Sequence, residues 1–243
     1  MSKLAKHYPA LGKTPYYQKV LRTQRDYLLA YWMQAEPSGS VALDTSGNSR
    51  TGAYTGVDLG QAGIGDGKTC PWFDGVNDYN NVYSTSLRDA FNGAEGSVAC
   101  WAKVNSAAVW TDGVERFIVR FRTDGASNVL IEKNAINNQI QWEYRAADTV
   151  QSRVSTVYNL NTWLHLALTW SKSGDVVRAY GNGEQVGADM TGLGIWAGEL
   201  LGWASLIGAF VTTPGAVWHG WLAHVPVWSI ALTGAEVANL AKV

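Results

Sequence analysis

The chain has few of the residues on which reactive and metal sites most often depend. Among its 243 residues are two cysteines, four histidines and only 16% charged residues. Cys70 and Cys100 belong to no Cys/His cluster with zinc-ligand spacing, and the N-terminus MSKLAKHYPAL lacks the apolar core of a secretory signal. The longest weakly polar run, 192–211, is interrupted by Glu199, Ser205 and several glycines, so no membrane span is expected. The sequence predicts synthesis in the cytoplasm with both thiols reduced.

Catalytic motifs are missing as well. No G-x-S-x-G nucleophile elbow occurs. The stretch GQAGIGDGKT ends like a phosphate-binding loop, but Ala62 stands where the first glycine is required and Pro71 would stop the helix that should follow. Glu132, Glu143 and Glu184 are isolated from one another in the sequence, so only folding could pair them as glycoside hydrolysis requires. These absences predict a protein that is not an enzyme.

Acidic residues are absent from the first 25 positions, although the whole chain has a net charge of −1. This N-terminal arm contains six basic residues: Lys3, Lys6, Lys13, Lys19, Arg22 and Arg25. The other 13 basic residues are outnumbered by 20 acidic ones, so the arm is +6 and the body −7. The arm is either a docking segment for an acidic partner surface or nucleic acid, or a solvated terminus. The body has no basic patch, which argues against nucleic acid as a partner.

Glycine and aromatic residues, by contrast, are abundant: the chain has 26 Gly, 12 Trp and 11 Tyr. This composition favours an all-β sandwich over a helical bundle, because glycine costs about 1 kcal/mol in a helix interior relative to alanine. Residues 163–170 alternate between two faces, and turns at 173–175 and 182–183 join them to two further strands. The pattern predicts an antiparallel meander that needs a second sheet packed over it.

The rest of the chain predicts more strands and two short helices. Strands are expected at residues 27–33, 96–104, 115–122, 128–133, 139–145, 200–210 and 217–228. A helix is expected at 15–25, behind Thr14-Pro15, and another near the C-terminus, where Thr233 and Glu236 have the spacing of a capping box. We divide the chain into the basic arm, 1–26, and one sandwich domain, 27–243.

Three tryptophans in loop-like contexts are candidates for a ligand site. Trp110, Trp196 and Trp203 lie near glycines or small residues, and Asp112 and Glu199 lie close to two of them. Aromatic rings stack on sugar faces while a few polar groups bind the hydroxyls, so this set is the candidate glycan site. The alternative interpretation is that the rings fill the core or a subunit interface.

Three aspartates beside glycines, Asp44, Asp74 and Asp78, are candidate ligands for Ca²⁺. The alternative is that each carboxylate caps its own turn. His219 and His224 are five positions apart, which places them on opposite faces of a strand and argues against a shared metal. The histidines are therefore interpreted as structural or surface residues.

The order of several landmarks resembles a known family. These are YWMQAEPSG, DTSGN, FDGVNDY, VACWAKV, NTWLHLALTW, YGNGEQVG and HGWLAHVPVWSIALTGAEVANL. Over residues 27–243 the chain resembles a laminin-G-like domain of the concanavalin A-like lectin and glucanase superfamily, in the form found in phage and bacterial proteins. The resemblance implies a jelly roll of two antiparallel sheets. It also implies an acidic residue near the final strand that joins Asp44 at a calcium ion, but Ala223-His224-Val225 stands there instead.

From these observations we expect a non-enzymatic, lectin-like recognition module. The first hypothesis is a phage virion-surface protein, a capsid decoration or tail-associated component, attached through its arm to a protein assembly or to further copies of itself. The second is a carbohydrate-binding lectin module with Ca²⁺ as a candidate cofactor. The third, an endo-glycosidase or polysaccharide lyase, needs converging carboxylates that the sequence does not show.

Overall fold

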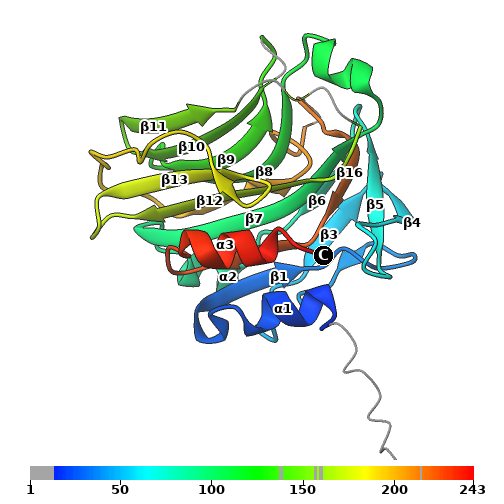
Figure 1. Cartoon of the computed structure of the whole chain (residues 1–243), viewed down its shortest axis with the longest axis horizontal. Helices are drawn as coiled ribbons and strands as arrows, with labels where there is room; N and C mark the ends of the chain where they lie inside the picture. The colour runs from blue at the N-terminus through cyan, green and yellow to red at the C-terminus, as the bar shows by residue number, and fades with distance from the viewer. Residues whose placement is uncertain (1–13, 137–138, 156–157, 159–160, 214) are drawn as a thin grey trace, which may run out of the picture.

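The computed structural model consists of two antiparallel β-sheets stacked face to face, with short helices at the two ends of the chain (Figure 1). It describes residues 14–136, 139–155, 158, 161–213 and 215–243. The predicted all-β sandwich is confirmed. None of the helices in the described part of the chain has the length and apolar run that a membrane crossing requires.

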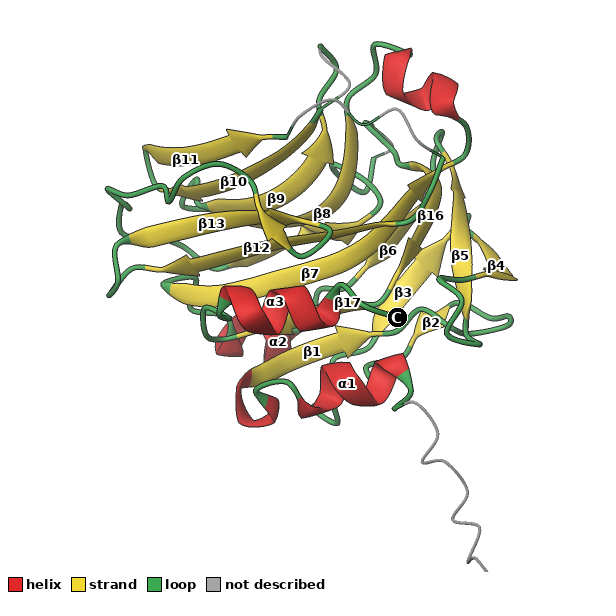
Figure 2. Ribbon diagram, in the orientation of Figure 1, coloured by secondary structure: helices red, strands yellow, loops and turns green. Residues whose placement is uncertain are grey.

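Sheet A contains nine strands, in the order β14-β13-β12-β7-β16-β5-β4, with β17 paired to β7 and β1 paired to β17 (Figure 2). Its strands are β1 (Leu28–Trp32), β4 (Asp58–Ala62), β5 (Thr69–Asp74), β7 (Glu95–Val104), β12 (Leu164–Ser171), β13 (Val176–Gly181), β14 (Glu184–Gln185), β16 (His219–Ala223) and β17 (Val225–Trp228). Sheet B contains eight strands, in the order β11-β10-β9-β8-β15-β6-β3-β2. They are β2 (Val41–Ala42), β3 (Gly52–Thr55), β6 (Tyr79–Asn81), β8 (Arg116–Thr123), β9 (Asn128–Lys133), β10 (Ile140–Ala146), β11 (Thr149–Val154) and β15 (Leu200–Ile207).

The core between the sheets follows from the alternation of the central strands. Leu166 of β12 pairs with Cys100 of β7, and both side chains are fully buried in the main core. The same core contains the alternate residues Leu164, Leu168, Trp170, Val98, Ala102 and Val104. Burying such a side chain stabilises the fold by about 1.5–3 kcal/mol. The predicted alternation of residues 163–170 between two faces is thus present in β12.

The order of strands differs from the prediction in two places, and the helix expected at 15–25 is shorter, α1 (Tyr16–Arg22). The single strand expected at 217–228 is two strands, β16 and β17, separated at His224, whose φ of 52° interrupts the extended backbone. The break has a reason in pairing: β16 pairs with β5 and β7, whereas β17 pairs with β1 and β7. Strand β11 was not expected from the sequence. Its residues alternate between half-buried and exposed positions, so neither face of the strand has a continuous row of buried apolar side chains.

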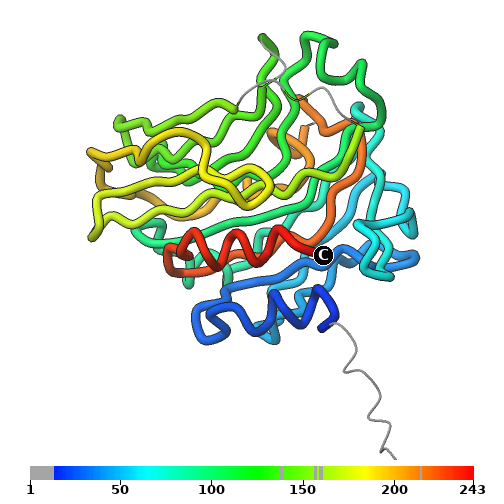
Figure 3. The backbone as a smooth tube through the Cα atoms, in the orientation of Figure 1, coloured from blue at the N-terminus to red at the C-terminus, as the bar shows by residue number. Residues whose placement is uncertain are grey.

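The two ends of the chain form one layer on the outer face of sheet A. Helix α1 (Tyr16–Arg22) buries Tyr16 and Val20 there, and α3 (Gly234–Leu240) buries Val237 and Leu240 in the same second core cluster. The predicted capping box at the start of α3 is present. Lys19 of α1 donates to the main-chain carbonyls of Asn239 and Lys242, so the two ends lie side by side (Figure 3).

Candidate functional site

A pocket of about 330 Å³ opens on the outer face of sheet B. Strands β8, β9 and β10 form its floor, and Phe210, which follows β15, forms part of its wall. Its polar lining consists of Glu115, Arg120, Arg122, Asn128, Glu132, Gln141, Glu143 and Arg145. The volume falls within the range of small-molecule sites in proteins.

Strand alternation explains why so many polar side chains meet in this pocket. Val129 and Ile131 of β9 point into the main core, so Asn128, Leu130 and Glu132 point outward. The same alternation in β10 places Gln141, Glu143 and Arg145 on the outer face, since Trp142 and Tyr144 are core residues.

The register of the three strands arranges these outward residues in rows. Glu132 lies opposite Gln141, and Leu130 lies between Arg120 and Glu143. Asn128 lies between Arg122 on β8 and Arg145 on β10. The rows bring together residues that are up to 25 positions apart in the sequence, from Arg120 to Arg145.

Although they lie on an outer face, the central side chains of the pocket are buried. Arg120 is 3% exposed, Glu132 4% and Asn128 6%. The chain after β15 returns over β8, where the main-chain N–H of Phe117 donates to the carbonyl of Ala216. The Arg120 guanidinium stacks on the ring of Phe210 at 3.8 Å and donates to the Phe210 carbonyl at 2.6 Å. The pocket is therefore a recess and not a flat sheet surface.

A hydrogen-bonded chain fixes one side of the recess. Arg120 Nε donates to Asn128 Oδ1 at 3.4 Å, and Asn128 Nδ2 donates to Glu143 Oε1 at 3.1 Å. Arg145 Nε forms an ion pair with the same Glu143 oxygen at 3.2 Å. Glu143 is thus fixed by two partners, one of which is the cation of Arg145.

Glu132, unlike Glu143, has no hydrogen-bonding partner for its carboxyl group in the described part of the chain. Its carboxyl group makes no hydrogen bond or ion pair to any residue in the described ranges. Burial, reinforced by the negative charges of Glu115 and Glu143, raises the pKa of Glu132 to about 8. At neutral pH the group is therefore largely protonated, with one hydroxyl to donate and one carbonyl oxygen to accept.

The structure does not bring the five predicted ligand residues together. Trp110 is 1% exposed and belongs to the main core, so its ring is closed to a ligand. Asp112 forms ion pairs with Arg116 at 2.7 Å and Lys133 at 2.8 Å, which hold the turn before β8.

Trp196 is also a packing residue. Its ring centroid lies 5.6 Å from that of Phe91 and 5.8 Å from that of Tyr144. It covers Gly93, which has φ of 65° and would place a Cβ atom only 2.0 Å from the ring. A glycine is therefore required beneath it.

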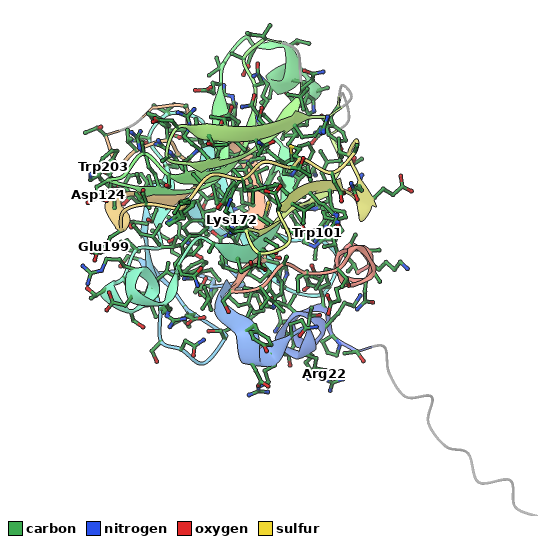
Figure 4. All side chains as sticks on the ribbon, turned by 90° about the vertical axis from the view of Figure 1, so that its left-hand side faces the viewer. Arg22, Trp101, Asp124, Lys172, Glu199 and Trp203 are labelled. Atoms are coloured by element: carbon green, nitrogen blue, oxygen red, sulfur yellow. The ribbon has the colours of Figure 1, made fainter. Side chains whose placement is uncertain are left out.

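Trp203 and Glu199 lie at the surface, on the same side of the molecule (Figure 4). Glu199 forms an exposed ion pair with Arg88 at 3.4 Å. Trp203 is 45% exposed, and the guanidinium of Arg122, a pocket residue, lies 5.9 Å from its ring centroid. Trp203 is thus the member of the predicted set that borders the pocket.

The predicted calcium ligands are engaged with the backbone. Asp44 accepts from the main-chain N–H groups of Tyr31, Ser46 and Arg50, each at 2.9 Å. Asp74 accepts from Val76 and Asn77, and Asp78 accepts from Asp74. Over the described ranges, no three His, Cys, Asp or Glu side chains are grouped as metal ligands. These carboxylates accept from main-chain N–H groups, as the alternative interpretation expected, and Asp44 also connects its loop to β1 through Tyr31.

Two histidines, His165 and His224, lie in packed surroundings. His224 is 1% exposed; its Nδ1 lies 2.5 Å from the hydroxyl of Tyr31 and its Nε2 lies 3.1 Å from Asp66. His165 is fully buried, and burial lowers its pKa to about 3, so its ring is neutral. Both histidines act as scaffold.

Of the predicted docking arm, Lys3, Lys6 and Lys13 lie outside the described residues. Lys19 is engaged with the end of α3, and Arg22 donates to Gln18 at 3.3 Å. Arg25 is exposed in a short 3₁₀ helix, Arg25–Tyr27. Figure 4 shows Arg22 at the opposite end of the molecule from Trp203.

The sequence interpretation missed Arg120, Glu132 and Glu143 as site residues. A signal was present: the expected strands 128–133 and 139–145 have polar residues at alternate positions. Their adjacency in the sheet and the return of the chain at Phe210 had no local signal.

Comparison with known proteins agrees with this architecture. A laminin-G family model, described as the concanavalin A-like lectin/glucanases superfamily, matches residues 74–238. Among curated proteins, none matches the sequence.

Solved structures with a similar fold include toxin and enzyme chains. The receptor binding domain of botulinum neurotoxin C/D mosaic serotype is 16% identical, with a TM-score of 0.67 over 89% of this chain and 51% of that one. The botulinum neurotoxin serotype D binding domain is 14% identical, with a TM-score of 0.63 over 89% and 52%. Trypanosoma rangeli sialidase is 14% identical, with a TM-score of 0.66 over 89% and 32%. The chain thus spans about half or less of these proteins, and at such identities the likeness concerns the fold alone.

Proposed function

Because the chain belongs to the concanavalin A-like lectin/glucanases superfamily, we propose that it is a lectin-like recognition module that binds carbohydrate in the pocket on sheet B. The observation that carries this proposal is the recess itself, in which buried hydrogen-bonding side chains lie beside an exposed tryptophan. Sugar recognition requires a small number of polar groups in fixed positions and an aromatic surface.

The lining supplies both donors and acceptors to sugar hydroxyls. Protonated Glu132 offers one of each, and the Gln141 amide beside it offers its N–H donors, while its oxygen already accepts from Asn134. Trp203 at the rim supplies the flat apolar surface on which a ring stacks. Since Asn128 and Glu143 are already hydrogen-bonded to each other, they are held in place before a ligand arrives.

The experiment is a glycan array with the full chain, followed by titration of any glycan that binds. Trp203→Ala should weaken binding about tenfold, which corresponds to about 1.4 kcal/mol for one stacked ring. Tyr27→Ala is the matched control, because Tyr27 is 49% exposed but lies by α1, away from the pocket. An array with no bound glycan, or equal losses in the two variants, counts against the proposal.

We further propose that the module is a phage-type virion-surface protein, attached through its basic arm and facing outward. Two observations support this arrangement: the arm is +6 against a body of −7, and its described part lies on the outer face of sheet A, opposite the pocket. Removal of residues 1–13 should leave a folded, glycan-binding domain that no longer assembles with particles. Unchanged assembly would exclude the arm as the attachment.

Glycoside hydrolysis is a second candidate, favoured by one specific observation. Glu132 and Glu143 are diagonal neighbours on β9 and β10; the pKa of Glu132 is raised to about 8, whereas Glu143 forms an ion pair with Arg145. Such a difference is the pattern of an acid and a base in glycosidases. The test is release of reducing ends from the glycans that bind, compared between the unaltered chain and Glu132→Gln. Binding without release would leave recognition as the function.

A further inference from the structure

Two cations in the pocket form no ion pair with any residue in the described part of the chain. Arg120 and Arg122 are two residues apart on β8, so both side chains project from the same face of the sheet. Arg122 forms no hydrogen bond or ion pair with a described residue. Arg120 donates only to neutral oxygens, those of the Phe210 carbonyl and the Asn128 amide.

The acidic residues of the pocket do not supply the missing charge. Glu143 is compensated by its ion pair with Arg145. Glu132 is largely protonated at neutral pH, as its pKa of about 8 implies. Glu115 is exposed at the rim, where water screens its charge. The recess therefore carries positive charge within a chain whose net charge is −1.

A buried charge without an ion-pair partner is unfavourable. Burial and repulsion by Arg122 lower the pKa of Arg120 to about 10, because they outweigh the opposite influence of Glu132, Glu143 and Glu115; the guanidinium still stays charged at neutral pH. A buried cation is normally paired with an anion, because desolvation without a partner costs several kcal/mol. An anionic group entering the pocket would meet this requirement.

We infer that the ligand is an acidic saccharide, whose carboxylate or sulfate group binds between the guanidinium groups of Arg120 and Arg122 while its ring contacts Trp203. The inference rests on the proposed function and narrows its substrate class. Guanidinium groups bind oxyanions through paired N–H donors. The hydroxyl of protonated Glu132 adds a further donor, and Phe210 and Asn128 hold Arg120 in position beforehand.

The test is calorimetric titration of the full chain with two matched pairs of oligosaccharides. One pair is an oligouronate and its carboxyl-reduced, neutral form; the other is a sulfated oligosaccharide and its desulfated form. At least one acidic form should bind about tenfold or more tightly than its neutral partner, and added salt should reduce the difference. The pair that shows the difference identifies the anionic group.

Substitutions of Arg122 test whether this residue causes the preference for the acidic form. Arg122→Gln should remove about tenfold of the affinity for the acidic form and change the neutral form less than about twofold. Arg122→Lys, which keeps the charge, should retain part of the preference. Arg25→Gln is the matched control: it removes the same charge from an exposed site by α1. Thermal unfolding of each variant verifies the fold.

Two outcomes would overturn the inference and leave the proposed function standing. In one, acidic and neutral forms bind the unaltered chain equally well. In the other, Arg25→Gln reduces the acidic affinity as much as Arg122→Gln does. Absence of any binding, acidic or neutral, would overturn the proposed function itself and the inference with it.

Discussion

The outer faces of the two sheets have the same backbone pattern but opposite side-chain chemistry. On sheet A, Trp101, Ala167 and Trp228 lie in the second core cluster beneath α1 and α3. On sheet B, Arg120 and Glu132 line an open recess. The apolar face is closed by the chain ends and contributes stability, whereas the polar face stays accessible although its buried charge is costly. Mutations on the first face should therefore change stability, and mutations on the second should change binding.

The largest expected effect is on the stability of sheet A. Trp228 is fully buried, and its Nε1 donates to the carbonyl of Thr23 at 2.8 Å. Trp228→Ala should lower the free energy of unfolding by about 3–5 kcal/mol, measured by chemical denaturation, without altering the affinity of the folded protein for its ligand. Trp203→Ala on the other face should cost less than about 1 kcal/mol. Equal costs would remove the distinction between the faces.

Truncation separates the two parts of the N-terminal arm. Removal of residues 1–25 also removes Tyr16 and Val20 from the second core cluster and should cost about 2–5 kcal/mol of stability. Removal of residues 1–13 should change the unfolding free energy by less than about 0.5 kcal/mol. Denaturation curves of the two truncated proteins provide the measurement. If they coincide, α1 contributes nothing to the closed face.

A smaller effect on stability should appear at Glu132 and depend on pH. The pKa of Glu132 is raised to about 8 in the folded chain, so the folded state binds more protons than the unfolded state between about pH 5 and pH 8. Stability should fall as pH rises through this window. Glu132→Gln removes the ionisation, so the variant should be more stable than the unaltered chain by up to a few kcal/mol near pH 9 and similar near pH 5. Parallel pH dependence in both proteins would contradict the assignment.

The smallest effect is on binding. An acidic saccharide should bind about fivefold more weakly at pH 9 than at pH 6.5, roughly 1 kcal/mol, because ionised Glu132 adds a negative charge and loses its donor. The other charged groups that line the pocket are Glu115, Arg120, Arg122, Glu143 and Arg145. Glu132→Gln should abolish the pH dependence in calorimetric titrations. If the dependence persists, another of these groups controls it.

The sequence was sufficient for several elements whose structure depends on local pattern. Strand β9 begins and ends where alternation predicted, at Asn128 and Lys133, and the capping box of α3 is formed by Thr233 and Glu236. Period-2 alternation and cap chemistry act over a few residues, so they can be read without the fold.

The candidate site could not be predicted in the same way. Trp110 and Trp196 stand in loop-like sequence contexts, yet their rings pack into the main core or against it. Glu132 and Glu143 are separated in the chain, and only the pairing of β9 with β10 places them on one surface. The recess depends on long-range pairing and on the return of the chain at Phe210, neither of which leaves a local pattern.

The contact between Lys19 and the end of α3 has a consequence for how the domain can be attached to a support. Since α1 and α3 both lie on the outer face of sheet A, a support bound to this face would leave the recess on sheet B unobstructed. Many copies displayed on one support would then point their recesses away from it. Even a weak single-site affinity would suffice on such an array, because simultaneous engagement of several recesses raises the effective affinity by about two orders of magnitude or more.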